Sequence, residues 1–326
     1  MLGSSRFTIL AAATAATTLC LGLVPLAHAG VVFQADFTGQ AQAISNNGSV
    51  PSVTGGTATG YVQSTSAGYA SAAIGTNNPM ASASGGYLQV TEQADTSSPV
   101  KNNGGAGVTI TPTSGDGFDS WFSPTGSGSG GTNNTITGAF DFFYRGSLSS
   151  STWAGQTLRV FDTNTNLRIF LDSTGANALQ LGVMGGAQAI VNAGSLTPFT
   201  AGGLVHVAGT VTTNTTSGLV TATLYAVAGN TAITPGTTSI AGTGTSASAF
   251  TLTSSGLAGT AFDFGHTFYG FKSTVAQTEA FDQFRIYNGI PTTFSALPTS
   301  TPEPASLGLL AVGGLGLLLL GKRRHA

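Results

Sequence analysis

The chain has 326 residues, a formal net charge of −2, 47 glycines and only 7% charged residues, whereas an average soluble domain has about 25% charged residues. Disordered chains combine high net charge with low hydrophobicity, so a chain that is 41% hydrophobic is not of that class. Between residues 30 and 300 there are six basic and eleven acidic residues, a net charge of −5. The basic patch that nucleic-acid binding requires is therefore missing from this span, and we expect no nucleic-acid partner.

Residues 1–29 have the parts of a secretory signal peptide. Arg6 supplies the positive charge, an apolar stretch follows, and Ala27-His28-Ala29 fits the A-x-A cleavage pattern. We therefore expect cleavage before Gly30 and export of the remainder. The single cysteine, Cys20, lies in this segment, and we interpret it as a small hydrophobic residue rather than a lipid attachment point. The exported chain would then contain no disulfide and no cysteine metal ligand.

Residues 30–298 show short alternating or apolar runs bounded by Gly, Asn, Ser and Thr, which indicate β-strands. Strands of this kind, polar on one face and joined by short turns, favour antiparallel sheets with one buried face each. We predict one all-β domain, a two-sheet antiparallel β-sandwich of the jelly-roll type. The predicted strands are 31–37, 86–92, 107–112, 136–145, 157–162, 167–172, 178–184, 203–211, 218–227, 266–271 and 280–288.

Two stretches resemble low-complexity loops, "ISNNGSVPSVTGGTATG" (44–60) and "SPTGSGSGGTNN" (123–134). Both are long for connections in a compact domain, so we interpret them as insertions or surface excursions. Within the second, "GSGSGG" (126–131) fits G-x-G-x-x-G. It lies in a Ser/Gly loop and lacks the strand–turn–helix context of a dinucleotide-binding loop, so we expect no dinucleotide binding there.

Three strand sequences carry a family resemblance. "GLVHVAGTVTTNTTSGLVTATLYAVAGN" (203–230) is similar to the paired strands of laminin-G-like, concanavalin-A-like jelly rolls. "AFDQFRIYNGIP" (280–291) resembles their last strand, and "VVFQADF" (31–37) resembles the first strand, which lies beside the last. The usual tryptophan before the first of the paired strands is absent, with Leu204 nearby instead. The resemblance implies a jelly roll, and many domains of this kind bind calcium.

Candidate metal ligands are few. His206 and His266 are the only histidines between residues 30 and 300, with no H-x-x-x-H spacing. We expect His206, in mid-strand, to be a packed or surface residue, and a metal pair of Asp263 with His266 is a weaker alternative. Asp36 and Asp282 lie on the predicted first and last strands, where they could bind calcium or only solvate an exposed face. We therefore name no metal ligand, and no cofactor other than this possible calcium ion.

Catalytic patterns are also weak. Glycoside hydrolysis needs two carboxyl groups, and Glu92 and Glu279 are the only glutamates between residues 30 and 300. The E-x-D-x-x-E pattern of concanavalin-A-like glycosidases is absent, so we expect solvent-facing carboxylates at strand ends. No G-x-S-x-G elbow occurs. The aromatic residues Trp121, Trp153 and Tyr287 could stack on sugar rings, but core packing is the expected role for most of them.

The C-terminal segment, residues 299–326, has a separate organisation. Pro302-Glu303-Pro304 precedes an uncharged stretch from Ala305 to Leu320 and a basic cluster, Lys322, Arg323 and Arg324. As a helix this stretch would span about 24 Å, against about 30 Å of membrane hydrocarbon. The basic cluster would stop in the cytoplasm by the positive-inside rule. These features favour transient inner-membrane association through 305–320 over a permanent anchor.

These three parts, in this order, resemble a PEP-CTERM sorting signal. The resemblance implies a partner, an exosortase-type membrane enzyme that processes exported proteins in Gram-negative bacteria making extracellular polysaccharide. It implies that Pro302, Glu303 and Pro304 are recognised by that enzyme and catalyse nothing themselves. The alternative is an ordinary C-terminal transmembrane helix after a proline-rich linker.

The sequence therefore predicts an exported, non-enzymatic protein of the cell surface or extracellular matrix. We expect a structural or interaction role, with extracellular polysaccharide as a possible contact. Two alternatives remain: a lectin-like carbohydrate-binding module, with or without calcium, and a divergent glycosidase that uses Glu92 or Glu279.

Overall fold

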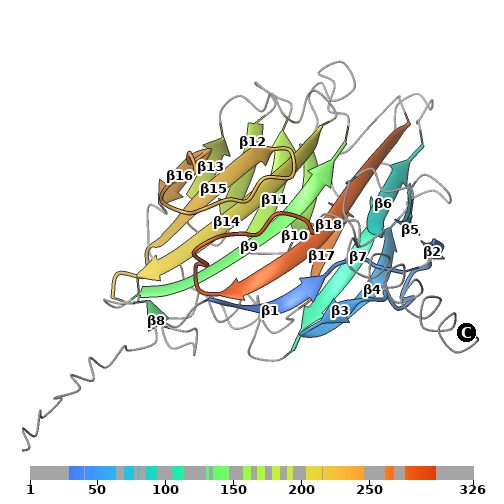
Figure 1. Ribbon diagram of the computed structural model, residues 1–326, viewed down its shortest axis with the longest axis horizontal. Helices are drawn as coiled ribbons and strands as arrows, with labels where there is room; N and C mark the ends of the chain where they lie inside the picture. Colours follow the sequence, from blue (N-terminus) through green and yellow to red (C-terminus); the bar gives the residue numbers. More distant parts are fainter. Residues whose placement is uncertain are drawn as a thin grey trace, which may run out of the picture.

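The protein forms two antiparallel β-sheets that face each other, as a computed structural model shows (Figure 1). The structure describes residues 29–39, 41–63, 70–76, 80, 86–93, 105–113, 130–131, 135–146, 157–162, 167–172, 178–183, 189–193, 203–214, 216–245, 261–267 and 276–298. Within these ranges there are strands and turns but no helix. The predicted all-β sandwich is therefore confirmed.

The larger sheet has eleven strands, eight of which follow one another in the order β16-β15-β14-β9-β18-β6-β5-β2. Its central strands are the longest, and they hold the residues of the candidate site. The bounds of its strands are β1 (Gly30–Ala35), β2 (Gln42–Ile44), β3 (Val53–Thr54), β5 (Ala70–Gly75), β6 (Tyr87–Glu92), β8 (Gly130–Gly131), β9 (Thr135–Arg145), β14 (Leu204–Asn214), β15 (Val220–Ala228), β16 (Gly242–Thr245) and β18 (Gln277–Asn288).

The smaller sheet has seven strands in the order β13-β12-β11-β10-β17-β7-β4. Its strands are β4 (Gly56–Gln63), β7 (Gly105–Pro112), β10 (Thr157–Asp162), β11 (Leu167–Asp172), β12 (Ala178–Val183), β13 (Ala189–Ala193) and β17 (Phe262–Thr267). Four consecutive strands, β10 to β13, form a meander of neighbouring antiparallel pairs.

A bulge divides β18 into two halves with different partners. Its register on β9 shifts between Asp282 and Arg285, and Gln283 has φ 50°, as expected where an extra residue interrupts the ladder. The first half pairs with β6 and the second half with β1. The first and last strands of the domain are therefore neighbours, as the jelly-roll resemblance predicted.

The core between the sheets is rich in aromatic rings. Phe264 of β17 packs against Phe281, Phe284 and Phe142, with ring centroids 5.2, 4.5 and 5.5 Å away. All four side chains are at most 1% exposed. Burying a Phe side chain contributes roughly 1.5–3 kcal/mol, so this cluster is a principal source of stability.

Each of the eleven predicted strands overlaps an observed strand, and 157–162 and 167–172 agree at both ends. The interpretation of 44–60 as one loop is wrong, because β3 and most of β4 lie there. Gly60 of β4 lies so close to the chain that a Cβ would be 2.0 Å from the carbonyl oxygen of Ser45. Glycine at this position therefore allows the two segments to pack closely, although glycine in a sequence usually indicates a loop. In the second predicted loop, 130–131 form β8.

Two segments cover the outer face of the larger sheet, the face turned away from the smaller sheet. One is the covering loop, residues 229–241, between β15 and β16; the other is the strap, residues 289–298, which follows β18. Both cross in front of the larger sheet in Figure 1, coloured orange and dark orange-red. An isolated bridge between Ile233 and Phe294 joins them.

The described residues include no helix of the length and apolarity needed to span a membrane. All of the predicted signal peptide 1–29 except Ala29, and the whole predicted tail 299–326, lie outside the described residues, so the signal peptide and the sorting tail stay predictions.

Candidate functional site

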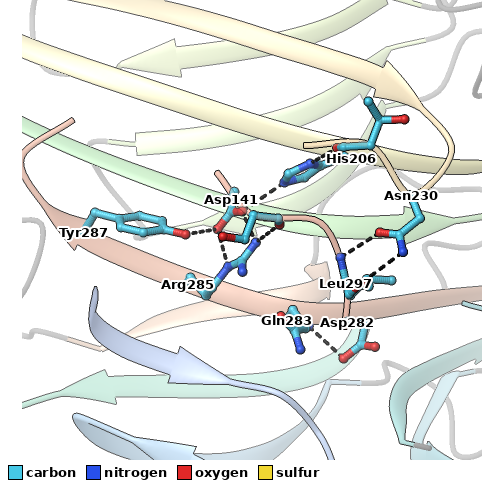
Figure 2. A network of polar contacts seen from close by, with 10 residues as sticks. Asp141, His206, Asn230, Asp282, Gln283, Arg285, Tyr287 and Leu297 are labelled. Carbon is cyan, nitrogen blue, oxygen red and sulfur yellow. Dashed lines mark hydrogen bonds and ion pairs between the residues drawn. The ribbon is translucent and has the colours of Figure 1, made fainter. Parts of the chain in front are cut away.

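The most concentrated polar group in the described residues lies under the covering loop and the strap. Asp141, His206 and Arg285 come from β9, β14 and β18, three adjacent strands of the larger sheet. Asp141 alternates with Phe140 and Phe142, which point into the core, so its side chain points to the outer face. Figure 2 shows the three side chains converging with Tyr287; we name these four residues the polar network.

Asp141 is the centre of the polar network. Its carboxylate accepts hydrogen bonds from Arg285 Nε at 2.8 Å, from Arg285 Nη2, and from the Tyr287 hydroxyl at 3.1 Å. Asp141 is completely buried, and Arg285 and Tyr287 are 6% and 4% exposed. A buried charge is tolerated only when it is paired and hydrogen-bonded, and this two-pronged arginine–carboxylate contact supplies both conditions.

His206 links the polar network to the covering loop. Its Nε2 lies 2.9 Å from Asp141 Oδ2 and its Nδ1 lies 2.7 Å from the carbonyl oxygen of Thr231. Both partners are hydrogen-bond acceptors, so a ring nitrogen that carries a proton donates to the partner it faces. The ring also stacks on Phe143, with centroids 4.1 Å apart. His206 is thus a packed residue, as predicted.

The surroundings of the polar network favour the neutral form of Tyr287 and the charged form of Arg285. Burial raises the pKa of Tyr287 far above its usual value, and the negative charge of Asp141 adds to this effect. Burial by itself would lower the pKa of Arg285, but the charge and hydrogen bonds of Asp141 raise it overall. Arg285 is therefore a permanent cation and Tyr287 a permanent donor at neutral pH.

The polar network holds the two covering segments on the sheet. Arg285 Nη2 donates to the carbonyl oxygen of Ser295 at 2.7 Å in the strap, while His206 bonds the covering loop. Asn230 connects the segments directly: its Nδ2 donates to the Leu297 carbonyl at 3.0 Å, and the Leu297 N–H donates to its Oδ1 at 2.6 Å. Figure 2 shows both bonds.

Apolar contacts complete this cover. Ile233, Phe294 and Leu297 are at most 2% exposed. Phe294 packs edge-on against Tyr287, with ring centroids 5.4 Å apart, and Leu297 joins a cluster with Phe143. The strap therefore combines buried apolar anchors with backbone hydrogen bonds, and it belongs to the folded domain.

Asp36 and Asp282, the calcium candidates, take local roles. Asp36 Oδ1 accepts from the N–H and hydroxyl of Thr38, at 3.3 and 3.1 Å, which caps a turn. Asp282 is completely buried at the bulge and accepts from the Gln283 N–H, so its expected alternative, an exposed face, is wrong. No group of three or more His, Cys, Asp or Glu side chains in the described residues could hold a metal ion.

The expectation that Glu279 faces solvent is also wrong, because its side chain is 3% exposed. It lies two residues before Phe281, and so on the same, core-facing side of β18. Burial raises the pKa of Tyr144 well above its usual value, and the charge of Glu279 adds to this. Glu92 lies directly opposite Gln277 in the β6–β18 ladder, but its side chain is outside the described residues.

Tyr287 is buried in a second cluster and does not present a ring to a ligand, which confirms the expectation of core packing. Asp263 accepts a hydrogen bond from the Thr109 hydroxyl at 2.7 Å, and the side chain of His266 is outside the described residues. The remaining candidates also lie outside them: Cys20, Ala27, Trp121, Trp153, Pro302, Glu303, Pro304, Lys322, Arg323 and Arg324.

Sequence reasoning missed Asp141, Arg285 and Asn230 as interacting residues. A usable signal was present for the first, because Asp141 is the single charge inside the aromatic run "FDFFY". Such a charge in a central strand predicts a buried ion pair. The sequence does not identify its partners, which lie 65 and 144 residues away.

A row of threonines lies beside the covering loop on the same outer face. Direct pairing places Thr221 opposite Thr245 and Thr223 opposite Thr243, and their hydroxyls are hydrogen-bonded at 2.9 and 3.3 Å. Thr212 lies opposite Thr221 on the next strand. We name these five residues the threonine face; all of them are exposed or half-buried.

No family model matches this chain, and no curated protein matches it. Among solved structures, the botulinum neurotoxin serotype C1 binding domain is similar at 13% identity with a TM-score of 0.40, over 78% of this chain and 48% of that one. Alginate lyase vAL-1 from Chlorella virus is similar at 12% identity with a TM-score of 0.35, over 66% and 88% of the two chains. The chain thus spans about half the length of the neurotoxin structure. Likeness this distant does not bear on activity or ligand.

Proposed function

We propose that this protein is an exported β-sandwich with a structural or interaction role at the cell surface or in the extracellular matrix, and that an exosortase-type enzyme processes its C-terminal tail. The observation that carries the proposal is where the folded domain begins and ends. Strand β1 starts at Gly30, directly after the A-x-A pattern, and pairs with β18, the last strand. The strap then reaches Pro298, before Pro302-Glu303-Pro304. The described domain thus runs between the two predicted targeting segments and includes one residue of the first, Ala29, which packs against a buried apolar cluster.

The polar network supports a non-enzymatic role for the titratable residues that compose it. Asp141 and His206 have no exposed surface, and their hydrogen bonds go to each other, to Arg285 and Tyr287, and to backbone carbonyls. A catalytic acid or base must reach substrate. The position of these groups is instead suited to holding the covering loop and the strap.

The test is the intact mass of the protein from a Gram-negative host that has an exosortase-type enzyme, measured separately in the envelope and the medium. We expect loss of residues 1–29 and of the tail after about Pro304. The matched control replaces Pro302, Glu303 and Pro304 with alanine and should retain the tail. A wild-type chain that keeps residues 305–326 and stays in the inner membrane would contradict the proposal and favour a tail-anchored periplasmic domain.

A second candidate function, carbohydrate binding, is favoured by the threonine face. Its exposed hydroxyls form a regular uncharged array, with strands about 4.8 Å apart, and hydroxyl groups can both donate to and accept from sugars. The test is a polysaccharide pull-down with residues 30–298, with and without calcium, compared with a Thr221→Val/Thr223→Val variant. Equal retention of both proteins, or no retention at millimolar sugar, would exclude this face as the binding site.

A further inference from the structure

The strap determines how far the predicted tail can extend from the folded domain. Its last buried anchor is Leu297, held by Asn230 through two hydrogen bonds. Pro302 is the fifth residue after Leu297, and five fully extended residues reach at most about 18 Å. With the strap docked, the length of the chain therefore limits how far Pro302 can be from Leu297 to about 18 Å.

An undocked strap would change this reach. The last residue of β18 is Asn288, fourteen residues before Pro302, and fourteen extended residues reach at most about 50 Å. Opening the strap therefore adds about 30 Å of available chain. That is about the thickness of the membrane hydrocarbon, enough to separate a bulky domain from an enzyme in the membrane.

The contacts of the strap make it one cooperative unit with the covering loop. The N–H groups of Ile233 and Phe294 donate to each other's carbonyl oxygens at 3.0 and 2.7 Å. The polar network bonds both segments at once, through His206 to Thr231 and through Arg285 to Ser295. Segments joined in this way open together rather than residue by residue.

We infer that the strap is a latch: docked, it keeps the Pro302-Glu303-Pro304 motif close to the domain, and opened together with the covering loop, it releases the motif to the processing enzyme. Asn230, Arg285 and His206 act as positioning residues in this latch. The inference rests on the proposed function for its consequence, the processing of the tail, but the latch itself is a property of described residues alone.

The first measurement is hydrogen–deuterium exchange of the full chain in detergent, for wild type and two matched variants. Asn230→Ala removes the two bonds to Leu297. Asn214→Ala is the control, because it removes two similar bonds, to the N–H groups of Thr216 and Ser217 at 2.9 and 2.8 Å, in the β14–β15 turn.

The amides to follow are those of Ile233 and Phe294, whose own hydrogen bonds both variants leave in place. In Asn230→Ala we expect both amides to exchange about tenfold faster, and by the same factor, since the loss of side-chain hydrogen bonds favours the open state. In Asn214→Ala they should remain within about twofold of wild type. Unchanged exchange in Asn230→Ala, or an equal increase at amides of β9, would overturn the latch.

The second measurement is the rate of tail removal in the host. Asn230→Ala should be processed faster than wild type, by up to about tenfold, and Asn214→Ala at the wild-type rate. Equal rates for the two variants would overturn the link between latch and processing. If wild type is never processed, the proposed function fails and the link fails with it, while the exchange measurement still decides whether the strap and loop open as one unit.

Discussion

The two faces of the larger sheet are buried in different ways. The inner face meets the smaller sheet through rings and aliphatic side chains, as Phe264 does with Phe281 and Phe284. The outer face is covered by two irregular segments, and Asp141 and Arg285 lie beneath them. The inner face therefore needs only shape and apolarity, whereas the outer face depends on a specific set of polar partners.

The difference shows how loops can be fixed on a sheet. A loop has no ladder of its own, so its carbonyl groups need donors from elsewhere once they are buried. His206 and Arg285 contact the carbonyl oxygens of Thr231 and Ser295, and Asp141 pairs with the charge of Arg285. Burying ionic groups is a poor source of net stability. In this protein the polar network fixes where the covering segments lie, and the apolar core supplies most of the stability.

The largest expected effect is that of Asp141→Ala. This substitution leaves Arg285 as an uncompensated buried cation and removes the acceptor of the Tyr287 hydroxyl. We expect a loss of about 3–5 kcal/mol in the free energy of unfolding, measured by urea denaturation. A double variant, Asp141→Leu/Arg285→Met, should recover a large part of this loss, because it removes both charges. A double variant less stable than the single one would show that the ion pair is itself a main source of stability.

The next effect concerns pH. The folded-state pKa of Tyr287 is raised above its ordinary value of 10.0, by burial first and then by Asp141. The stability that this provides is present below about pH 10 and is lost as pH rises further, since only the unfolded chain then ionises at this residue. Wild type should lose about 1.4 kcal/mol per pH unit above pH 10 through this residue.

Tyr287→Phe measures this contribution. At pH 7 it removes one hydrogen bond to a carboxylate, worth about 1.5–3 kcal/mol. Between pH 10 and 11 the variant should lose stability less steeply than wild type, in urea denaturation at each pH. Parallel curves for the two proteins would contradict the assignment. Tyr144 stays in both proteins and contributes the remaining part of the slope, because burial and Glu279 raise its pKa as well.

The inner face should respond more moderately to a change of shape. Phe264→Leu keeps the site apolar but removes the ring contacts with Phe142, Phe281 and Phe284. We expect a loss of about 1–2 kcal/mol, with exchange at the strap amides changed no more than exchange elsewhere. Selective opening of the strap in this variant would show that the two faces of the larger sheet are coupled and do not respond independently.

The sequence predicted the sheets well where strands contain large residues. In "ITGAFDFFYR" and "AFDQFRIYN", aromatic and β-branched side chains indicate strands, and β9 and β18 lie there. It failed at β4 and β5, because their Gly, Ala and Thr residues also suit loops. These strands are fixed by close backbone packing, as at Gly60. No pattern in the local sequence indicates such packing.

The site was predictable only in part. His206 and Tyr287 were expected to be packed, and both are. Their partnership with Asp141 depends on the register of β9 with β14 and β18, and register is a tertiary property. The strap has no strand or helix pattern. Its order comes from Phe294 and Leu297 meeting clusters formed by other strands. The sequence analysis placed it in the domain, which was predicted to end at residue 298, but gave no sign that it covers the outer face of the larger sheet.

The smallest expected effect is on the threonine face. Thr221→Val keeps the shape of the side chain and removes one hydroxyl–hydroxyl contact, that with Thr245 at 2.9 Å. The pair is exposed, so water replaces the lost bond and valine suits a strand. We expect a change within about 0.5 kcal/mol in urea denaturation. Such a variant separates binding from stability: a loss of polysaccharide retention in an equally stable protein would come from the hydroxyl itself. A loss of several kcal/mol would instead mean that these threonines are structural, and that the outer face depends on polar pairing over its whole length.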